Sequence, residues 1–184
     1  FVAGEPALKY VQKQEASIIN ISQILNAQQE KLIEAVDNLR NQLESLRRGK
    51  KALIRKVAHL ESETISKHAV EVKRLKVYVV AEEGLDEEYY IGVGERAIEA
   101  HPDLIYCAFT MQNDLVRTLV FSGSKARARG VKAGEVVKRV AQIIGGSGGG
   151  DARFGQGGGN LLEKVPEARN KVASIIGELA VSQV

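Results

Sequence analysis

The chain has 184 residues, of which 44% are hydrophobic and 27% are charged, and it carries a formal net charge of +3. This length accommodates one or two small domains with a real hydrophobic core, and the excess of positive charge is compatible with nucleic-acid binding without being diagnostic of it. The single cysteine, Cys107, excludes an intramolecular disulfide, and its apolar neighbours predict a buried thiol. Because no apolar stretch approaches membrane-spanning length, we expect a cytoplasmic protein that does not bind a membrane.

Two helices are expected at the start of the chain. Apolar residues recur at helical spacing from Leu8 to about Leu25, Asn26 and Ala27 interrupt the pattern, and a second helix is predicted from Gln28 to about His68. The second helix carries a heptad seam, which is broken near Lys50. The apolar seam residues are Leu32, Val36, Leu39, Leu43, Leu46, Leu53, Val57 and Leu60. The first helix is too short to cover this seam, so we expect a homodimer, with packing on the rest of the chain as the alternative.

The periodicity changes after His68, which predicts a helical dimerisation subdomain over 1–70 and a globular subdomain over 71–184. Strands are expected at 75–80, 104–109 and 116–121, the last two joined by a turn at 112–114. Helices are expected at 86–100, 131–144 and 166–179. The predicted fold class is therefore α+β: a long, coiled-coil-like helical hairpin followed by a small α/β sandwich with a mixed sheet and a Gly-rich loop.

Two basic clusters are candidates for contact with RNA phosphates. The first lies on the long helix and has a solvated helix face as its alternative interpretation. Its members are Arg47, Arg48, Lys50, Lys51, Arg55 and Lys56. The second cluster is the better candidate, because it covers a loop and a helix start, from which long side chains reach a ligand. Its members are Lys125, Arg127, Arg129, Lys132, Lys138 and Arg139.

The run from Gly145 to Gly159 contains nine of the chain's 18 glycines. Glycine is costly to order unless the backbone needs positive φ or a very close approach. Bare backbone N–H groups suit an anion, so this segment is a further candidate RNA site. Its candidate residues are Gly148, Gly149, Gly150, Arg153, Phe154 and Gln156. We expect Phe154 to point outward and stack on a base. The alternatives are a core position for this ring and, for the run, a flexible hinge or a glycine-packed crossing of two elements.

Catalytic motifs are absent from the sequence. No Gly-Lys-Ser/Thr of a P-loop occurs, and the one Gly-x-Gly-x-x-Ala match, which starts at Gly92, follows an acidic run rather than a buried strand. The histidines His59, His68 and His101 are far apart, and none has zinc-ligand spacing with a cysteine. We therefore expect no catalytic residues, no metal site and no cofactor in this chain.

The glycine run, together with Ala133-Gly134-Glu135 at the opening of the preceding helix, resembles the C-terminal domain of alanyl-tRNA synthetase. A related domain follows the catalytic domain of DHH-family phosphoesterases. The likeness covers nearly the whole chain, with departures at Asp151, where the family often has arginine, and at Gly155, where alanine is usual. Since the first residue is Phe1, we expect a piece of a longer polypeptide.

The resemblance implies a non-catalytic domain that dimerises and binds tRNA(Ala). It would assist aminoacylation and editing by upstream domains, which would use ATP, Mg and Zn. Two alternatives remain: a nucleotide or single-stranded nucleic acid-binding module of a DHH-type phosphoesterase, and a pure dimerisation domain without a ligand.

Overall fold

The computed structural model describes residues 4–83 and 87–181. The chain divides into two compact units, 1–51 and 52–184. The division lies inside a helix, about 20 residues before the boundary that the change of periodicity suggests. The reason is that the last part of this helix packs on the globular unit, as described below.

The first unit consists of α1 (Glu5–Leu25), a 3-10 turn η1 (Gln29–Lys31) and the start of α2 (Leu32–His68). The residue after α1, Asn26, is left-handed with φ 46°, and the Ala27 N–H donates to Ser22 O at 3.0 Å. This pattern ends a helix, so the interruption expected at Asn26 is confirmed. The 37 residues of α2 continue through Gly49, which gives a helix about 55 Å long.

The second unit is built on one six-stranded sheet with the order β1-β2-β3-β4-β6-β5. The strands are β1 (Val70–Val72), β2 (Leu75–Glu83), β3 (Leu104–Gln112), β4 (Leu115–Ser122), β5 (Ser147–Gly150) and β6 (Phe154–Gly159). The helix α3 (Glu87–Ala100) connects β2 to β3, which pair in parallel, whereas the other pairs are antiparallel. Asn113 and Asp114, both at positive φ, form the two-residue turn between β3 and β4. The expected mixed sheet and its hairpin are therefore confirmed.

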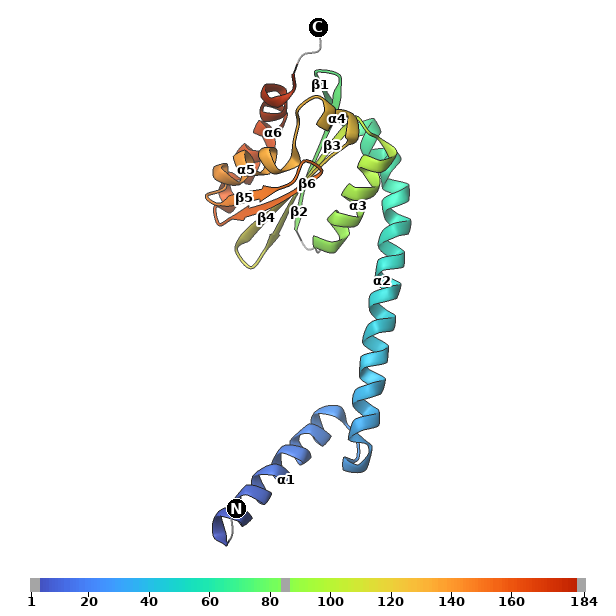
Figure 1. The fold of residues 1–184 in the computed structure, drawn as a ribbon, viewed down its shortest axis with the longest axis vertical. Coiled ribbons are helices and arrows are strands. Elements are labelled where there is room, and N and C mark those ends of the chain that lie inside the picture. Colours follow the sequence, from blue (N-terminus) through green and yellow to red (C-terminus); the bar gives the residue numbers. More distant parts are fainter. Residues whose placement is uncertain (1–3, 84–86, 182–184) are drawn as a thin grey trace. The chain divides into compact units, whose positions relative to one another are not determined.

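Helices cover both faces of this sheet (Figure 1). The helices α5 (Ala133–Ile143) and α6 (Val165–Leu179) pack on one face over a core that includes Cys107 and Val137. The helix α3 packs on the other face over Tyr106 and Phe121. Burial raises the pKa of the Cys107 thiol to about 12, so this cysteine is a protonated core residue, as expected. The strand β1 and the five-residue helix α4 (Ser124–Ala128) were not expected from the sequence pattern.

The C-terminal part of α2 also packs on the α3 side of the sheet. Its buried residues are Ile54, Ala58, Ser62 and Ile65, at steps of four, four and three. The predicted seam residues Leu53, Val57 and Leu60 are exposed instead. The C-terminal part of α2 therefore packs on the sheet through a stripe that includes an alanine and a serine. A pattern based on large apolar residues does not predict such a stripe.

Candidate nucleic-acid interface

The glycine run forms a β-hairpin rather than the expected loop. Its two strands, β5 and β6, pair from Ser147–Gly158 to Gly150–Gly155. A Cβ added to Gly155 would lie 2.8 Å from Ala133 O, and one added to Gly134 would lie 2.5 Å from Gly150 O. Both distances are far below ordinary contact. The glycines therefore allow the hairpin backbone to lie directly on α5, which corresponds to the glycine-packed alternative.

Asp151 organises the turn of this hairpin. Its carboxylate accepts hydrogen bonds from the backbone N–H groups of Arg153 at 2.7 Å and Phe154 at 2.8 Å. These two bonds hold the pKa of Asp151 below its usual value, and the bond from the Phe154 N–H has the larger effect. The short Asp151 side chain thus orders the turn between β5 and β6.

The turn also caps α5. The N–H groups of Ala133 and Gly134 donate to Ala152 O at 3.1 Å and to Asp151 O at 2.9 Å. The first N–H groups of a helix have no partner within the helix and often bind anions. In this protein two of them are already satisfied, so the start of α5 contributes less to an anion site than its position in the basic cluster suggested.

The three candidate side chains of the glycine run differ in their surroundings. Arg153 is exposed and forms an ion pair with Glu99 of α3 at 3.2 Å. The ring of Phe154 is half-buried, with its centroid 4.8 Å from that of Phe121, so its expected outward position was wrong and its ring packs on the core. Gln156 is exposed. Contact of these residues with RNA stays a prediction.

A hollow of about 500 Å³ lies over the hairpin beside β4. Gln156 lines this hollow, but Gly148, Gly149 and Gly150 do not. These three belong to β5, an edge strand whose outer backbone groups are not paired within the sheet. The full lining comprises Leu115, Val116, Arg117, Gly145, Ser147, Gln156, Gly157, Gly158, Gly159 and Asn160. Arg117 was missed, although its place as the one charged residue of β4 was a visible signal.

The second basic cluster is divided by the fold. Lys125 and Arg129 line a hollow of about 430 Å³ together with Arg74 and Asp103. The Arg129 guanidinium also donates to Lys73 O. Arg74 lies at positive φ in the turn between β1 and β2 and was not predicted, although the Lys73-Arg74 pair between two strands is a recognisable signal.

The other members of this cluster lie elsewhere. Lys132, the residue before α5, and Lys138 on α5 are exposed, while Arg139 forms an ion pair with Glu178 of α6 at 3.0 Å. Arg127 is half-buried, and its positive charge contributes to the lowered pKa of Asp151. The side chains best placed for a phosphate are therefore those of Arg74, Lys125, Lys132 and Lys138.

The predicted dimerisation residues are accessible. Leu39 is 55% exposed and Leu46 is 71% exposed. Of the eight residues, Leu32 is half-buried and the other seven are exposed. None of the 21 residues of α1 is buried either. Such a row of exposed apolar side chains is typical of an interface, so dimerisation remains a prediction with an available surface.

Within residues 4–83 and 87–181, no group of three or more His, Cys, Asp or Glu side chains is arranged to hold a metal ion. None of the helices in these two ranges combines the length and the apolar character that a membrane span requires.

Comparison with known proteins gives consistent results. Residues 63–178 match the DHHA1 domain. The chain is 32% identical to an alanine–tRNA ligase of Nitrosopumilus maritimus, over 96% of this chain and 19% of that protein. It is 30% identical to one of Nitrosomonas eutropha, over 94% of this chain and 20% of that protein. The chain therefore spans about a fifth of the length of these curated relatives.

A solved structure has the same fold. The C-Ala domain from Aquifex aeolicus alanyl-tRNA synthetase superposes with a TM-score of 0.54 and 21% sequence identity. The match covers 59% of this chain and 97% of that domain.

Proposed function

The chain belongs to the DHHA1 domain family, and we propose that it is the non-catalytic C-terminal part of an alanyl-tRNA synthetase. One observation carries this proposal. The DHHA1 match begins at residue 63, whereas the alanine–tRNA ligases align with 94–96% of the chain, which includes the long helices. The helical segment and the α/β unit therefore occur together in these relatives.

In this proposal the chain binds tRNA(Ala) through two features of the α/β unit. Lys125, with Arg74 and Arg129, supplies positive charge around one hollow, while Lys132 and Lys138 extend it along α5. Phosphate contacts of this kind supply affinity without reading sequence. The exposed edge of β5 and the Gln156 hollow offer backbone and polar groups to the same ligand.

The seam of α2 forms a homodimer in this proposal, because exposed apolar residues at heptad spacing are stabilised by a second copy. The chain itself catalyses no reaction and needs no cofactor. ATP, Mg and Zn are used by catalytic and editing domains upstream in the same polypeptide. By binding tRNA, the chain assists aminoacylation and editing. The protein acts in the cytoplasm.

A second candidate is a nucleotide or single-stranded nucleic acid-binding module of a DHH-type phosphoesterase. The observation in its favour is the hollow over the glycine hairpin, whose volume of about 500 Å³ suits a small ligand. Titrating the chain with mononucleotides and with full-length tRNA separates the two candidates. Binding of neither would favour a pure dimerisation domain.

The decisive experiment measures tRNA affinity as a function of salt concentration. Each neutralised phosphate adds about 0.7–0.9 to the slope of log affinity against log salt. Lys125→Ala with Lys132→Ala should therefore reduce the magnitude of the slope by about 1.4–1.8 units. The control is Lys164→Ala with Lys171→Ala, two exposed lysines that both pair with Glu167.

A footprint of labelled tRNA on the same variants locates the site. An affinity that does not depend on salt, or a slope that is the same in the test and control variants, would remove this cluster from the interface.

A further inference from the structure

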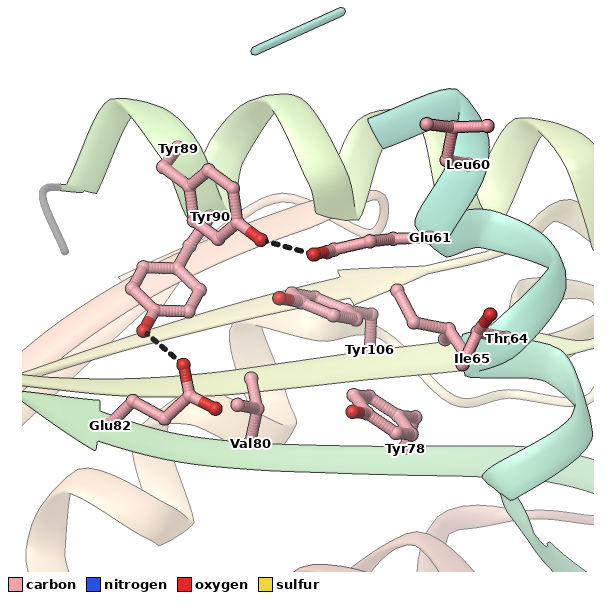
Figure 2. Close-up of a pocket in the computed structure, with 10 residues that line it drawn as sticks. All are labelled: Leu60, Glu61, Thr64, Ile65, Tyr78, Val80, Glu82, Tyr89, Tyr90 and Tyr106. Carbon is pink, nitrogen blue, oxygen red and sulfur yellow. Dashed lines mark hydrogen bonds between the residues drawn. The ribbon is translucent and has the colours of Figure 1, made fainter. Parts of the chain in front are cut away.

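A tyrosine-rich pocket lies on the opposite face of the sheet from α5 and α6. Its volume is about 310 Å³, and its walls come from α2, β2, α3 and β3 (Figure 2). It lies entirely within the second unit. The lining residues are Leu60, Glu61, Thr64, Ile65, Tyr78, Val80, Glu82, Tyr89, Tyr90 and Tyr106.

The charged side chains that line the pocket are both acidic. Glu61 and Glu82 belong to its wall, and none of the described lining residues is a lysine, arginine or histidine. Tyr89 donates a hydrogen bond to Glu61 at 2.6 Å, and Tyr90 donates to Glu82 at 3.4 Å. A carboxylate accepts about four hydrogen bonds, so one phenol leaves each of them with acceptor capacity.

The aromatic walls remain neutral rings. Desolvation and then the Glu82 charge raise the pKa of Tyr90 to about 12, and desolvation and the bond to Glu61 raise the pKa of Tyr89 further. Tyr78 and Tyr106 are stacked, with centroids 5.9 Å apart. Figure 2 shows these rings and the two carboxyl groups around a common space.

Carboxylates beside neutral aromatic rings attract organic cations. Ring faces attract ammonium and guanidinium groups through the ring quadrupole, and carboxylates accept their N–H donors. A phosphate would be repelled by the two glutamates, so this pocket differs in its chemistry from the basic surface. A hard divalent ion needs six or more oxygen ligands, whereas the described residues hold no group of three or more His, Cys, Asp or Glu side chains that could bind one.

We propose that this pocket is a binding site for a small organic cation that carries an alkylammonium group. The ammonium group lies between Glu61 and Glu82, and its alkyl chain contacts the rings of Tyr78 and Tyr106. The site takes a ligand of amino-acid size, because a volume of about 310 Å³ is at the lower end of small-molecule pockets. This proposal does not depend on tRNA binding.

The composition of the chain supplies a direct assay. The protein has five tyrosines and no tryptophan, and four of the tyrosines line the pocket. Replacing the fifth with Tyr10→Phe leaves tyrosine fluorescence as a signal from this pocket alone. The 184-residue chain with this change is titrated with n-butylammonium chloride and, in parallel, with n-butanol at matched sodium chloride concentration.

We expect a saturable fluorescence change with n-butylammonium and at least about tenfold weaker binding of n-butanol, which lacks the charge. Glu61→Gln and Glu82→Gln should each raise the dissociation constant at least about tenfold. The matched control is Glu83→Gln. This residue is exposed and adjacent to Glu82 on β2, but it is not part of the lining, and strand alternation turns its side chain to the other face.

Three results would overturn the proposal: equal binding of n-butanol, no saturable change with n-butylammonium, or equal affinities in Glu82→Gln and Glu83→Gln. Glu82 is exposed, so its replacement keeps the test decisive even if Glu61→Gln, which alters the bond to Tyr89, impairs folding.

Discussion

The packing of the glycine hairpin on α5 predicts opposite effects for two similar substitutions, Gly155→Ala and Gly149→Ala. A Cβ at Gly155 would lie 2.8 Å from Ala133 O and 2.9 Å from Val137 Cγ1, whereas ordinary contact begins at 3.4 Å. The hairpin would have to move outward by about 0.6 Å, and the helix backbone cannot yield. Overpacking of this kind costs about 1–3 kcal/mol of unfolding free energy.

Gly149 is the matched control, because it lies in the partner strand and a Cβ there would meet nothing within 4 Å. Its φ is also not positive, so alanine fits without strain. Gly149→Ala should leave the unfolding free energy unchanged or raise it by up to about 1 kcal/mol, because alanine restricts the unfolded chain.

The assay is urea denaturation of both variants and the wild type, followed by near-ultraviolet circular dichroism of the tyrosines. The unfolding free energy of Gly155→Ala should fall below that of Gly149→Ala by more than about 1 kcal/mol. Equal free energies in the two variants would refute the conclusion that the hairpin backbone rests on α5. The same proteins also test the edge of β5: if its exposed backbone contacts tRNA, Gly149→Ala should weaken tRNA binding while the fold stays intact.

Three further predictions follow from the packing and charges of single residues. Phe154→Ala should lower the unfolding free energy by about 1–3 kcal/mol, which is less than for a fully buried phenylalanine because the ring is only half-buried. If the variant melts at the same temperature as the wild type, the contact between Phe154 and Phe121 is contradicted. Leu39→Asp with Leu43→Asp should convert a dimer to a monomer in sedimentation without changing the melting of the α/β unit, and a monomeric wild type would end the dimer proposal. Asp151 has a lowered pKa, so its charge stabilises the fold above its ordinary pKa of 3.8 and loses this effect as the pH falls through the folded value. The stability difference between wild type and Asp151→Asn should therefore shrink below about pH 3.8 in thermal melts, and a constant difference would argue against these hydrogen bonds.

The elements that the sequence determined by itself depend on local chemistry. Asn26 stops α1 because asparagine tolerates the left-handed conformation, and Asn113-Asp114 forms a hairpin turn for the same reason. The buried faces of α5 and α6 follow from apolar residues at helical spacing. The glycine run also signalled a close approach of the backbone, since that is one of the two needs that justify so many glycines.

Only the tertiary structure shows that the glycine hairpin makes this close approach to α5. Glycine carries no side chain, so a glycine strand shows no alternation of polar and apolar residues, and the sequence pattern predicts a loop there. The core position of Phe154 depends on Phe121, which lies 33 residues away in the chain but pairs with it across β4 and β6.

The same limit applies to the two sites assembled by the fold. Arg74 joins Lys125 only because the β1–β2 turn lies beside α4, and Glu61 joins Tyr89 only because α2 packs against α3. Gly92 makes this last contact possible, since a Cβ there would lie 2.5 Å from Ile54 of α2. The sequence alone does not show which residues tens of positions apart come together, because their proximity depends on how helices and strands pack and not on local conformational preference.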